Sequence, residues 1–197
     1  MKICLFNAKG GVGRTTLALN LAGYFAHTQP RARVLVADCD PQGSALAWAA
    51  LASETPFTVG RSRSRGFDLE LIDLAPRIPE NGQLPDADLY LVPTLLDGVA
   101  FVVFLRTLAL LKEKRLPFRV VANRVNPRRA EHRERLAGRV MAGALVVRER
   151  SALASYYAEG RTVFDMTGRH IALAQDEIAA VGKAIPFSFR SPKRGAR

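Results

Sequence analysis

The sequence has few cysteines, no long apolar run and no internal repeat. Its two cysteines, Cys4 and Cys39, lie in short apolar runs without a CxxC partner, so we expect reduced, buried thiols and no cysteine metal site. The longest apolar stretch, residues 99–105, falls far short of the roughly 20 residues that span a bilayer. The opening apolar run, MKICLF, is too short for a signal peptide. These absences predict a cytoplasmic protein with no membrane partner.

The excess of basic charge is confined to one part of the chain. Residues 1–111 hold 10 Lys/Arg and 10 Asp/Glu, whereas residues 112–197 hold 19 and 8, so the whole net charge of +11 lies in the second part. A local excess of this size favours a polyanionic partner, most often nucleic acid. The alternative is a strongly solvated surface, and the preference for arginine over lysine also agrees with a GC-rich genome.

Short apolar runs alternate with helical patterns along the chain. Runs rich in β-branched residues and leucine predict buried parallel strands at residues 2–6, 33–39, 68–74, 89–94, 118–125 and 144–150. Helical patterns predict helices at residues 15–28, 98–114, 130–143, 151–160 and 170–185. This alternation is typical of an α/β fold with a doubly wound, mostly parallel sheet, whose ligands bind at the carboxyl ends of the strands. We expect one domain over residues 1–190 and a basic tail at 191–197 that is either disordered or adds to contact with a polyanion.

The first predicted strand leads into a glycine-rich loop, FNAKGGVGRTT, and then into a helix. In such a turn, backbone N–H groups and the helix N-terminus hold an anion. Gly10, Gly11 and Gly13 carry no Cβ and so leave room for phosphate oxygens. The loop departs from the pattern G-x-x-x-x-G-K-[ST], because Ala8 stands at its first glycine and Arg14 at its lysine. Taken alone, the loop is either a phosphate cradle or a tight turn without a ligand.

Six segments, in the right order, resemble the ParA/MinD family of ATPases. KGGVGRTT is similar to the family's deviant Walker A loop, and VLVADCDPQGSALAW to its D-x-D-P-Q motif. FDLELIDLAP resembles the Walker B strand, ADLYLVPTLLD the strand that ends in proline, and VVANRVNP the strand whose asparagine contacts adenine. RERSALASYYAEGRTVFD resembles a late segment of small plasmid-partition ATPases. The resemblance covers about residues 2–165, is closest to small ParA-type plasmid and chromosome partition proteins, and implies a P-loop NTPase-like fold.

The resemblance implies ATP and Mg²⁺ as cofactors and a role for each matching residue. The implied nucleotide contacts are Lys9, Gly10, Gly11, Val12, Gly13, Arg14, Thr15, Thr16 and Asn123, the last on the adenine edge. Lys9 would reach phosphates held by the other subunit, so that the homodimer forms only with ATP. Thr15 would ligate Mg²⁺, while Asp38 and Asp73 hold its water shell. Asp40 would orient the attacking water, which makes Lys9, Asp40 and Arg14 the implied catalytic residues.

Each of these polar residues also has a local alternative. Asp38 and Asp40 could cap the turn that follows them, because Asp-Pro initiates turns. Asp73 could be an ordinary residue at a strand end, and Asn123 could satisfy a buried backbone group. The joint occurrence of acidic residues at the ends of two neighbouring strands, beside a glycine loop, favours the functional interpretation.

Arg14 is the departure with the largest chemical consequence. An arginine keeps the charge of the family's lysine, but it is longer and planar and binds as a fork. Three outcomes are open: ATP binding with slow hydrolysis, which we favour, loss of binding, or an adapted loop in which Arg14 acts as an arginine finger in cis. Ala75, where the family prefers proline, is a second departure.

Arginines concentrate around the predicted helix 130–143. If that segment is one helix, several of them lie along one side and could track DNA phosphates without sequence preference. The candidates are Arg128, Arg129, Arg133, Arg135 and Arg139. The alternative is a solvated helix with pairs such as Glu131–Arg135.

The predicted function is therefore a ParA-type ATPase for DNA partition. It would dimerise on ATP, bind nucleoid DNA non-specifically, and release it when a ParB-like centromere-binding protein stimulates hydrolysis of ATP to ADP and phosphate. The alternative is a nucleotide-binding recruitment factor with little turnover, for example in conjugative transfer or polar positioning. A MinD-like membrane cycle is disfavoured, because the segment FSFRSPKRGAR shows no clear amphipathic helix.

Overall fold

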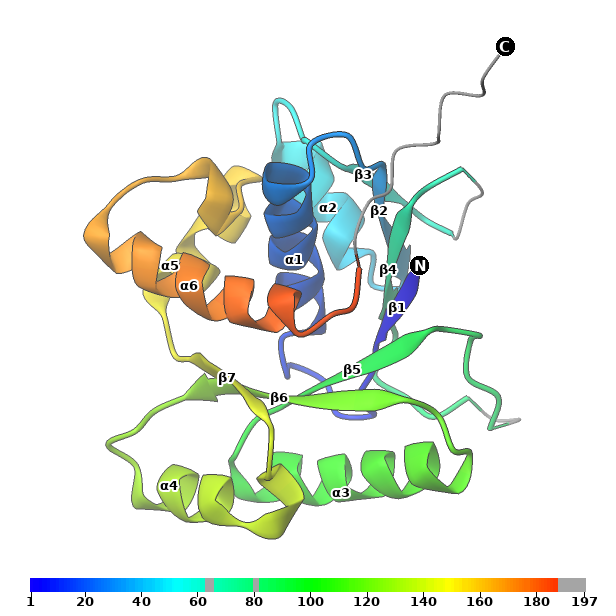
Figure 1. Ribbon diagram of the computed structural model, residues 1–197, viewed down its shortest axis with the longest axis vertical. Coiled ribbons are helices and arrows are strands. Elements are labelled where there is room, and N and C mark those ends of the chain that lie inside the picture. The colour runs from blue at the N-terminus through cyan, green and yellow to red at the C-terminus, as the bar shows by residue number, and fades with distance from the viewer. Residues whose placement is uncertain (63–65, 80–81, 188–197) are drawn as a thin grey trace, which may run out of the picture.

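Seven parallel strands form the central sheet of the protein (Figure 1). The computed structural model describes residues 1–62, 66–79 and 82–187. The strands, in chain order, are β1 (Lys2–Leu5), β2 (Val34–Cys39), β3 (Thr58–Gly60), β4 (Leu69–Leu74), β5 (Leu89–Thr94), β6 (Phe118–Val125) and β7 (Leu145–Arg148). Their spatial order is β3-β2-β4-β1-β5-β6-β7, and every neighbouring pair is parallel. The predicted doubly wound parallel α/β sheet is confirmed.

The strand order reverses around β1, which has β4 on one side and β5 on the other. In doubly wound sheets, such a reversal opens a crevice at the carboxyl ends of the strands. Asp38 in β2 pairs in register with Asp73 in β4, so two carboxylates lie at the same level of neighbouring strands. The topology therefore brings the glycine loop after β1 to the edge of the sheet where both aspartates lie.

Helices cover both faces of the sheet (Figure 1). One layer contains α1 (Arg14–Thr28), α2 (Ser44–Leu51), α5 (Ser151–Ser155) and α6 (Arg169–Lys183), and the other contains α3 (Gly98–Glu113) and α4 (Ala130–Ala137). Two clusters of buried apolar side chains lie between these layers and the sheet. One includes Phe25 and Trp48, and the other includes Tyr90 and Phe104. The two clusters account for why the strands consist of nearly continuous apolar runs.

The predicted helix over residues 130–143 is wrong in its length. α4 ends at Ala137, Gly138 is extended with φ −70° and ψ 148°, and Arg139–Met141 form a single 3₁₀ turn. Glycine is a poor helix former, which accounts for the break at this position. Arg139 therefore lies outside α4, as Arg128 and Arg129 do at its other end, and the expected stripe of arginines along one helix does not form.

Other predicted elements differ in smaller ways. The short helix predicted over 151–160 is α5 followed by a 3₁₀ turn, Tyr156–Glu159, and Gly160 ends it with φ 62°. α2 and β3 were not predicted, since β3 has only three residues and α2 is apolar with no clear helical period.

Cys4 is buried as predicted, whereas Cys39 is only half-buried. The predicted basic tail, 191–197, lies outside the described residues. No helix in the described part of the chain is long and apolar enough to cross a membrane.

Candidate functional site

The glycine loop connects β1 to the N-terminus of α1 and adopts left-handed backbone conformations. Gly11 has φ 72° and Gly13 has φ 91°, values that residues with a Cβ rarely adopt. A Cβ on Gly13 would also lie only 2.2 Å from Nδ2 of Asn123. The turn therefore requires glycine at position 13, both for its backbone angle and for the asparagine that approaches it from β6.

Asn7 anchors the start of this loop, a role that was not predicted from the sequence. Its side chain is fully buried; Nδ2 donates to the carbonyl of Pro93 at 2.8 Å, and Oδ1 accepts from the N–H of Lys9 at 3.0 Å. The N–H of Ala8 donates to Oγ1 of Thr107 in α3 at 3.3 Å. These contacts tie the loop to β5 and α3. A polar residue directly after an apolar strand was the signal in the sequence that could have identified Asn7.

Thr15 and Asp73 meet at the carboxyl end of β4. The hydroxyl of Thr15 donates to Oδ2 of Asp73 at 2.6 Å, and Asp73 is 1% exposed. Its other oxygen, Oδ1, is buried and accepts no hydrogen bond from the described residues. Burial raises the pKa of Asp73 to about 6, although the Thr15 hydroxyl and the Arg14 charge both act to lower it. The structure thus brings together two of the three residues predicted to serve the metal.

Asp38 and Asp40 both hold the turn that precedes α2. Oδ2 of Asp38 accepts from the N–H of Leu46 at 3.0 Å, and Oδ1 accepts from the N–H of Asp40 at 3.3 Å. Oδ1 of Asp40 accepts from the N–H of Gln42 at 3.0 Å. The local capping role considered for these residues is therefore present. Across the described ranges, no group of three or more histidine, cysteine or acidic side chains could hold a metal ion by itself, so a role in the water shell stays a prediction.

Arg14 points back into the glycine loop. Its side chain is 7% exposed, and Nη1 donates to the carbonyls of Asn7 and Lys9, both at 2.8 Å. Nη2 lies 3.9 Å from Oδ2 of Asp40, and Nε lies 4.0 Å from Oδ1 of Asp73. Burial lowers the pKa of Arg14, while the charges of Asp73 and Asp40 act to raise it. The guanidinium is thus held by the loop's own carbonyls and faces two carboxylates.

Asn123 also contacts the glycine loop. It is 5% exposed, and its Nδ2 donates to the carbonyl of Val12 at 2.8 Å. Beside it lies a cavity of about 610 Å³, whose lining includes Thr16, Glu149 and Tyr157. The amide thus satisfies a buried backbone group, as its local alternative proposed, and the contact of Asn123 with adenine stays a prediction.

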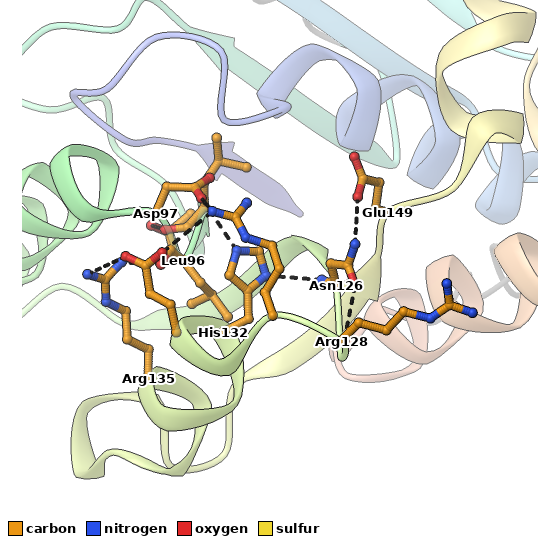
Figure 2. A network of polar contacts seen from close by, with 11 residues as sticks. Leu96, Asp97, Asn126, Arg128, His132, Arg135 and Glu149 are labelled. Atoms are coloured by element: carbon orange, nitrogen blue, oxygen red, sulfur yellow. Dashed lines mark hydrogen bonds and ion pairs between the residues drawn. The ribbon is translucent and has the colours of Figure 1, made fainter.

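Two of the arginines predicted to contact DNA form ion pairs within the protein, and Figure 2 labels one of them, Arg135. Nη2 of Arg129 lies 2.7 Å from Oδ1 of Asp97, the residue that precedes α3. Arg135 pairs with Glu131 at 2.8 Å and also donates to the carbonyl of Leu96. These contacts fasten α4 to the start of α3. Their guanidinium groups would have to leave these partners to bind phosphates.

The other three arginines predicted to contact DNA differ in whether their side chains are hydrogen-bonded within the protein. Nη1 of Arg133 donates to the carbonyls of Pro127 and Arg128, both at 2.9 Å, so it stabilises the turn before α4. Arg128 and Arg139 are exposed, and Figure 2 shows the Arg128 side chain pointing away from the network around Asp97. The five arginines therefore do not form one uniform surface.

A buried histidine lies at the centre of the same network. His132 is 2% exposed; its Nδ1 accepts from the N–H of Asn126 at 3.0 Å, and its Nε2 lies 3.4 Å from Oδ1 of Asp97 (Figure 2). His132 thus connects the loop after β6 to the start of α3. These contacts give the residue a structural role in holding the two segments together.

Residues 3–163 match the family described as the CobQ/CobB/MinD/ParA nucleotide binding domain. The chain belongs to this family. The predicted ParA/MinD family is confirmed, and it is a family of ATPases involved in partitioning and positioning.

Two curated relatives within the ParA/MinD group show how far the similarity extends. The chain is 34% identical over 142 residues to the maintenance of carboxysome distribution protein A of Gloeobacter kilaueensis, which covers 64% of each chain. It is 57% identical over 44 residues to the chromosome-partitioning ATPase Soj of Thermus thermophilus, which covers 22% of this chain and 17% of that protein. The chain therefore matches less than two thirds of the length of these relatives.

Solved structures of ParA/MinD proteins share the fold over nearly the whole chain. A protein of Borrelia burgdorferi described as a plasmid partition protein bound to AMPPNP has a TM-score of 0.74 at 17% identity, covering 93% of this chain and 99% of that one. A Cyanothece McdA–ATP complex has a TM-score of 0.73 at 13% identity, covering 97% and 98%. At these identities, the similarity establishes the fold alone.

Most residues of the site fit a nucleotide with Mg²⁺. The glycine loop presents backbone N–H groups at the N-terminus of α1, which suits phosphate oxygens. Oδ1 of Asp73 is a buried carboxylate oxygen without a hydrogen bond from the described residues, and a metal-bound water would supply one. Arg14 fits less well, because its guanidinium is already bonded to loop carbonyls.

Proposed function

We propose that the protein is a ParA-type ATPase that binds ATP with Mg²⁺ at the glycine loop and hydrolyses it slowly. The observation that carries this proposal is the contact between Thr15 and Asp73. These residues lie 58 positions apart in the chain, and their side chains meet at 2.6 Å directly behind the glycine loop. A loop for phosphates, a hydroxyl and a buried carboxylate at one sheet edge are the parts that this reaction needs.

Each residue of the site has a separate role in the proposed reaction. Residues 9–16 would hold the phosphates, Thr15 would hold the metal ion, and Asp38 and Asp73 would hold its water shell. Mg²⁺, when bound, neutralises charge on the phosphates. Asp40 orients the attacking water, and Asn123 borders the nucleobase. Hydrolysis is slow because Arg14 is longer and flatter than a lysine and is engaged by loop carbonyls.

The assembly proposed for the protein follows the ParA pattern. ATP bridges two copies through Lys9, residues 1–190 act as one domain, and the homodimer binds DNA non-specifically on the nucleoid. A ParB-like centromere-binding protein then stimulates hydrolysis. The net charge of +11, all of it within residues 112–197, supports the DNA contact.

The exposed arginines without an ion pair or side-chain hydrogen bond among the described residues are the stronger candidates for DNA. Arg128, Arg129 and Arg139 are all exposed, but Arg129 pairs with Asp97, and the half-buried Arg135 pairs with Glu131. We therefore place the first phosphate contacts at Arg128 and Arg139. Arg129, Arg133 and Arg135 contribute chiefly by holding α4 in place.

The test of the proposed function compares the wild type with Arg14→Lys. Binding of ATP and release of phosphate are measured with Mg²⁺, in the presence and absence of DNA. We expect ATP binding in both proteins and faster phosphate release by about tenfold or more in Arg14→Lys, equivalent to about 1.4 kcal/mol in the barrier. Asp40→Asn in the same background is the control for contaminating ATPases, because it removes the proposed water-orienting carboxylate. Failure of both proteins to bind ATP would reject the proposal.

A second candidate function is a nucleotide-dependent recruitment factor with little turnover. The hydrogen bonds from Arg14 to Asn7 and Lys9 favour it, because a guanidinium held in this way is not free to move with the reacting phosphate. This function predicts that the wild type binds ATP, yet releases no phosphate with or without DNA. Turnover would then arise only in Arg14→Lys.

A further inference from the structure

Arg14 bonds to two carbonyls of the glycine loop and faces two of the carboxylates beside it. Its Nη1 bonds to two loop carbonyls, its Nη2 faces Asp40, and its Nε faces Asp73. The Arg14 side chain is 7% exposed, so water does little to screen these interactions. The side chain therefore links the start of the loop to the ends of β2 and β4.

Two atoms at this contact lack hydrogen bonds. Nε of Arg14 and Oδ1 of Asp73 are both buried, they lie 4.0 Å apart, and neither has a hydrogen-bond partner among the described residues. A buried donor and a buried acceptor this close, but not bonded, form a contact that a better partner can replace. The carbonyl bonds of Nη1, at 2.8 Å, are by contrast well formed.

We propose that Arg14 is a built-in gate: in the ligand-free protein its guanidinium acts as an internal cation that competes with Mg²⁺ for Asp73 and holds the glycine loop closed on itself. The proposal concerns regulation of the proposed nucleotide site and rests on that function for the identity of the ligand. Its structural half, the tether within the loop, does not depend on any ligand.

The geometry distinguishes arginine from lysine in this position. A guanidinium offers five N–H donors on a rigid plane, so one side chain reaches two carbonyls and two carboxylates from different directions. A lysine ammonium is a single compact charge and cannot span these partners together. A lysine at position 14 would therefore leave the loop less tightly tethered and Asp73 more accessible to the water shell of a metal.

The tether is tested on the ligand-free protein. In buffer with EDTA, we expect Arg14→Lys and Arg14→Met to lower Tm by several degrees, because neither side chain can bond to both carbonyls and at the same time place positive charge beside both carboxylates. Arg106→Lys, at an exposed position of α3, is the matched control and should leave Tm unchanged. Equal Tm values in the wild type and both Arg14 variants would overturn the tether.

The gate is tested with AMPPNP, so that turnover plays no part. At a fixed concentration of AMPPNP, the Mg²⁺ concentration that gives half of the ligand-induced thermal shift is measured. We expect it to be about tenfold lower in Arg14→Lys than in the wild type, which corresponds to about 1.4 kcal/mol. Binding of AMPPNP by both proteins with the same Mg²⁺ dependence would overturn the gate and leave the proposed function standing. Absence of any shift in both proteins would reject the proposed function and the gate with it.

A measurement on the wild type covers the case in which a variant fails to fold. In ligand-free protein, the Nη1–H signals of Arg14 should be visible by NMR and slow to exchange with water, because this nitrogen is buried and bonded to two carbonyls. Addition of Mg²⁺ and AMPPNP should shift these signals or speed their exchange. Signals that stay unchanged in saturated protein would overturn the gate.

Discussion

At the residue scale, the burial of the Asp73 carboxyl group makes the stability of the protein depend on pH. Its carboxyl group is 1% exposed, and burial raises its pKa to about 6 from an ordinary value of 3.8. Between these two values the folded protein binds a proton that the unfolded chain has released. The stability of the metal-free protein therefore falls as the pH rises from about 4 to 6.

Replacement of Asp73 should remove this dependence. In Asp73→Asn, the unfolding free energy should fall less between pH 4 and pH 6 than it does in the wild type. At pH 7 in EDTA, we expect the variant to be more stable than the wild type by about 1–2 kcal/mol. Urea denaturation at several pH values measures it. Asp86→Asn is the control, since the Asp86 side chain is 89% exposed and should keep the wild-type slope. An unchanged slope in Asp73→Asn would contradict the raised pKa.

Asn123 provides a second test at the scale of the residue. Its amide donates to the buried carbonyl of Val12, so Asn123→Ala should leave that carbonyl without a donor and cost about 1–3 kcal/mol in the ligand-free protein. Thermal unfolding measures this cost against Gln42→Ala, which removes an exposed amide side chain. Wild-type stability in Asn123→Ala would show that the contact does not support the loop.

At the scale of elements, the contact between α1 and α6 sets how closely the first helical layer packs. Gly182 in α6 lies against the ring of Tyr24 in α1, and a Cβ at this glycine would lie 2.3 Å from Cε1 of that ring. Gly182 is buried, and Tyr24 belongs to the buried apolar cluster that also contains Phe25. α1 and α6 can approach this closely because glycine has no Cβ at position 182.

Gly182→Ala should therefore destabilise the protein, although alanine is the better helix former. We expect a loss of about 1–3 kcal/mol in unfolding free energy, because a rigid ring in a packed core cannot give way without cost. Gly98→Ala, where a Cβ would make only an ordinary contact at 3.9 Å with Arg135, serves as the control and should be nearly neutral. A gain in stability in Gly182→Ala would mean that the helices separate freely.

At the scale of the whole molecule, the proposed partners are a second copy and DNA. With Mg²⁺ and AMPPNP, we expect the wild type to change from monomer to dimer in light scattering coupled to size exclusion. Lys9→Ala should bind AMPPNP but stay monomeric, because Lys9 is proposed to reach the other subunit. Lys112→Ala, in the last turn of α3, removes an equal charge and should dimerise as the wild type does. A Lys9→Ala protein that dimerises would contradict the bridging role.

DNA binding should respond to salt in proportion to the number of phosphates that the protein neutralises. For the dimer, we expect Arg128→Ala and Arg139→Ala each to weaken binding and to lower the slope of log K against log salt by about 1 for each phosphate that is no longer bound. Arg135→Ala should leave this slope unchanged and instead lower Tm, because Arg135 binds Glu131 and packs 5.0 Å from the Phe101 ring. Binding that does not vary with salt would remove the DNA partner from the proposal.

The alternation of apolar runs with helical patterns, the glycine loop and the six family segments were enough to predict the parallel sheet and the ParA/MinD family. These features can be read from residues that are neighbours in the sequence. Runs of β-branched residues indicate buried strands, and the glycine at position 13 permits the left-handed backbone angle of the loop. The overlong helix predicted at 130–143 was wrong for a local reason too, since Gly138 ends α4 and the prediction gave this glycine no weight.

Apart from the Glu131–Arg135 pair, which the sequence offered as an alternative, the partners of the site's side chains followed from the folded chain alone. Thr15 meets Asp73, Asn123 meets Val12, and Arg129 meets Asp97 across separations of 58, 111 and 32 positions, because parallel strands bring their carboxyl ends to one edge. The carbonyls that hold Arg14 lie only five and seven positions away, yet they point inward only once the loop has folded against β5 and α3. Local pattern specifies which elements form, whereas the contacts of a buried polar group depend on which distant groups the sheet places beside it.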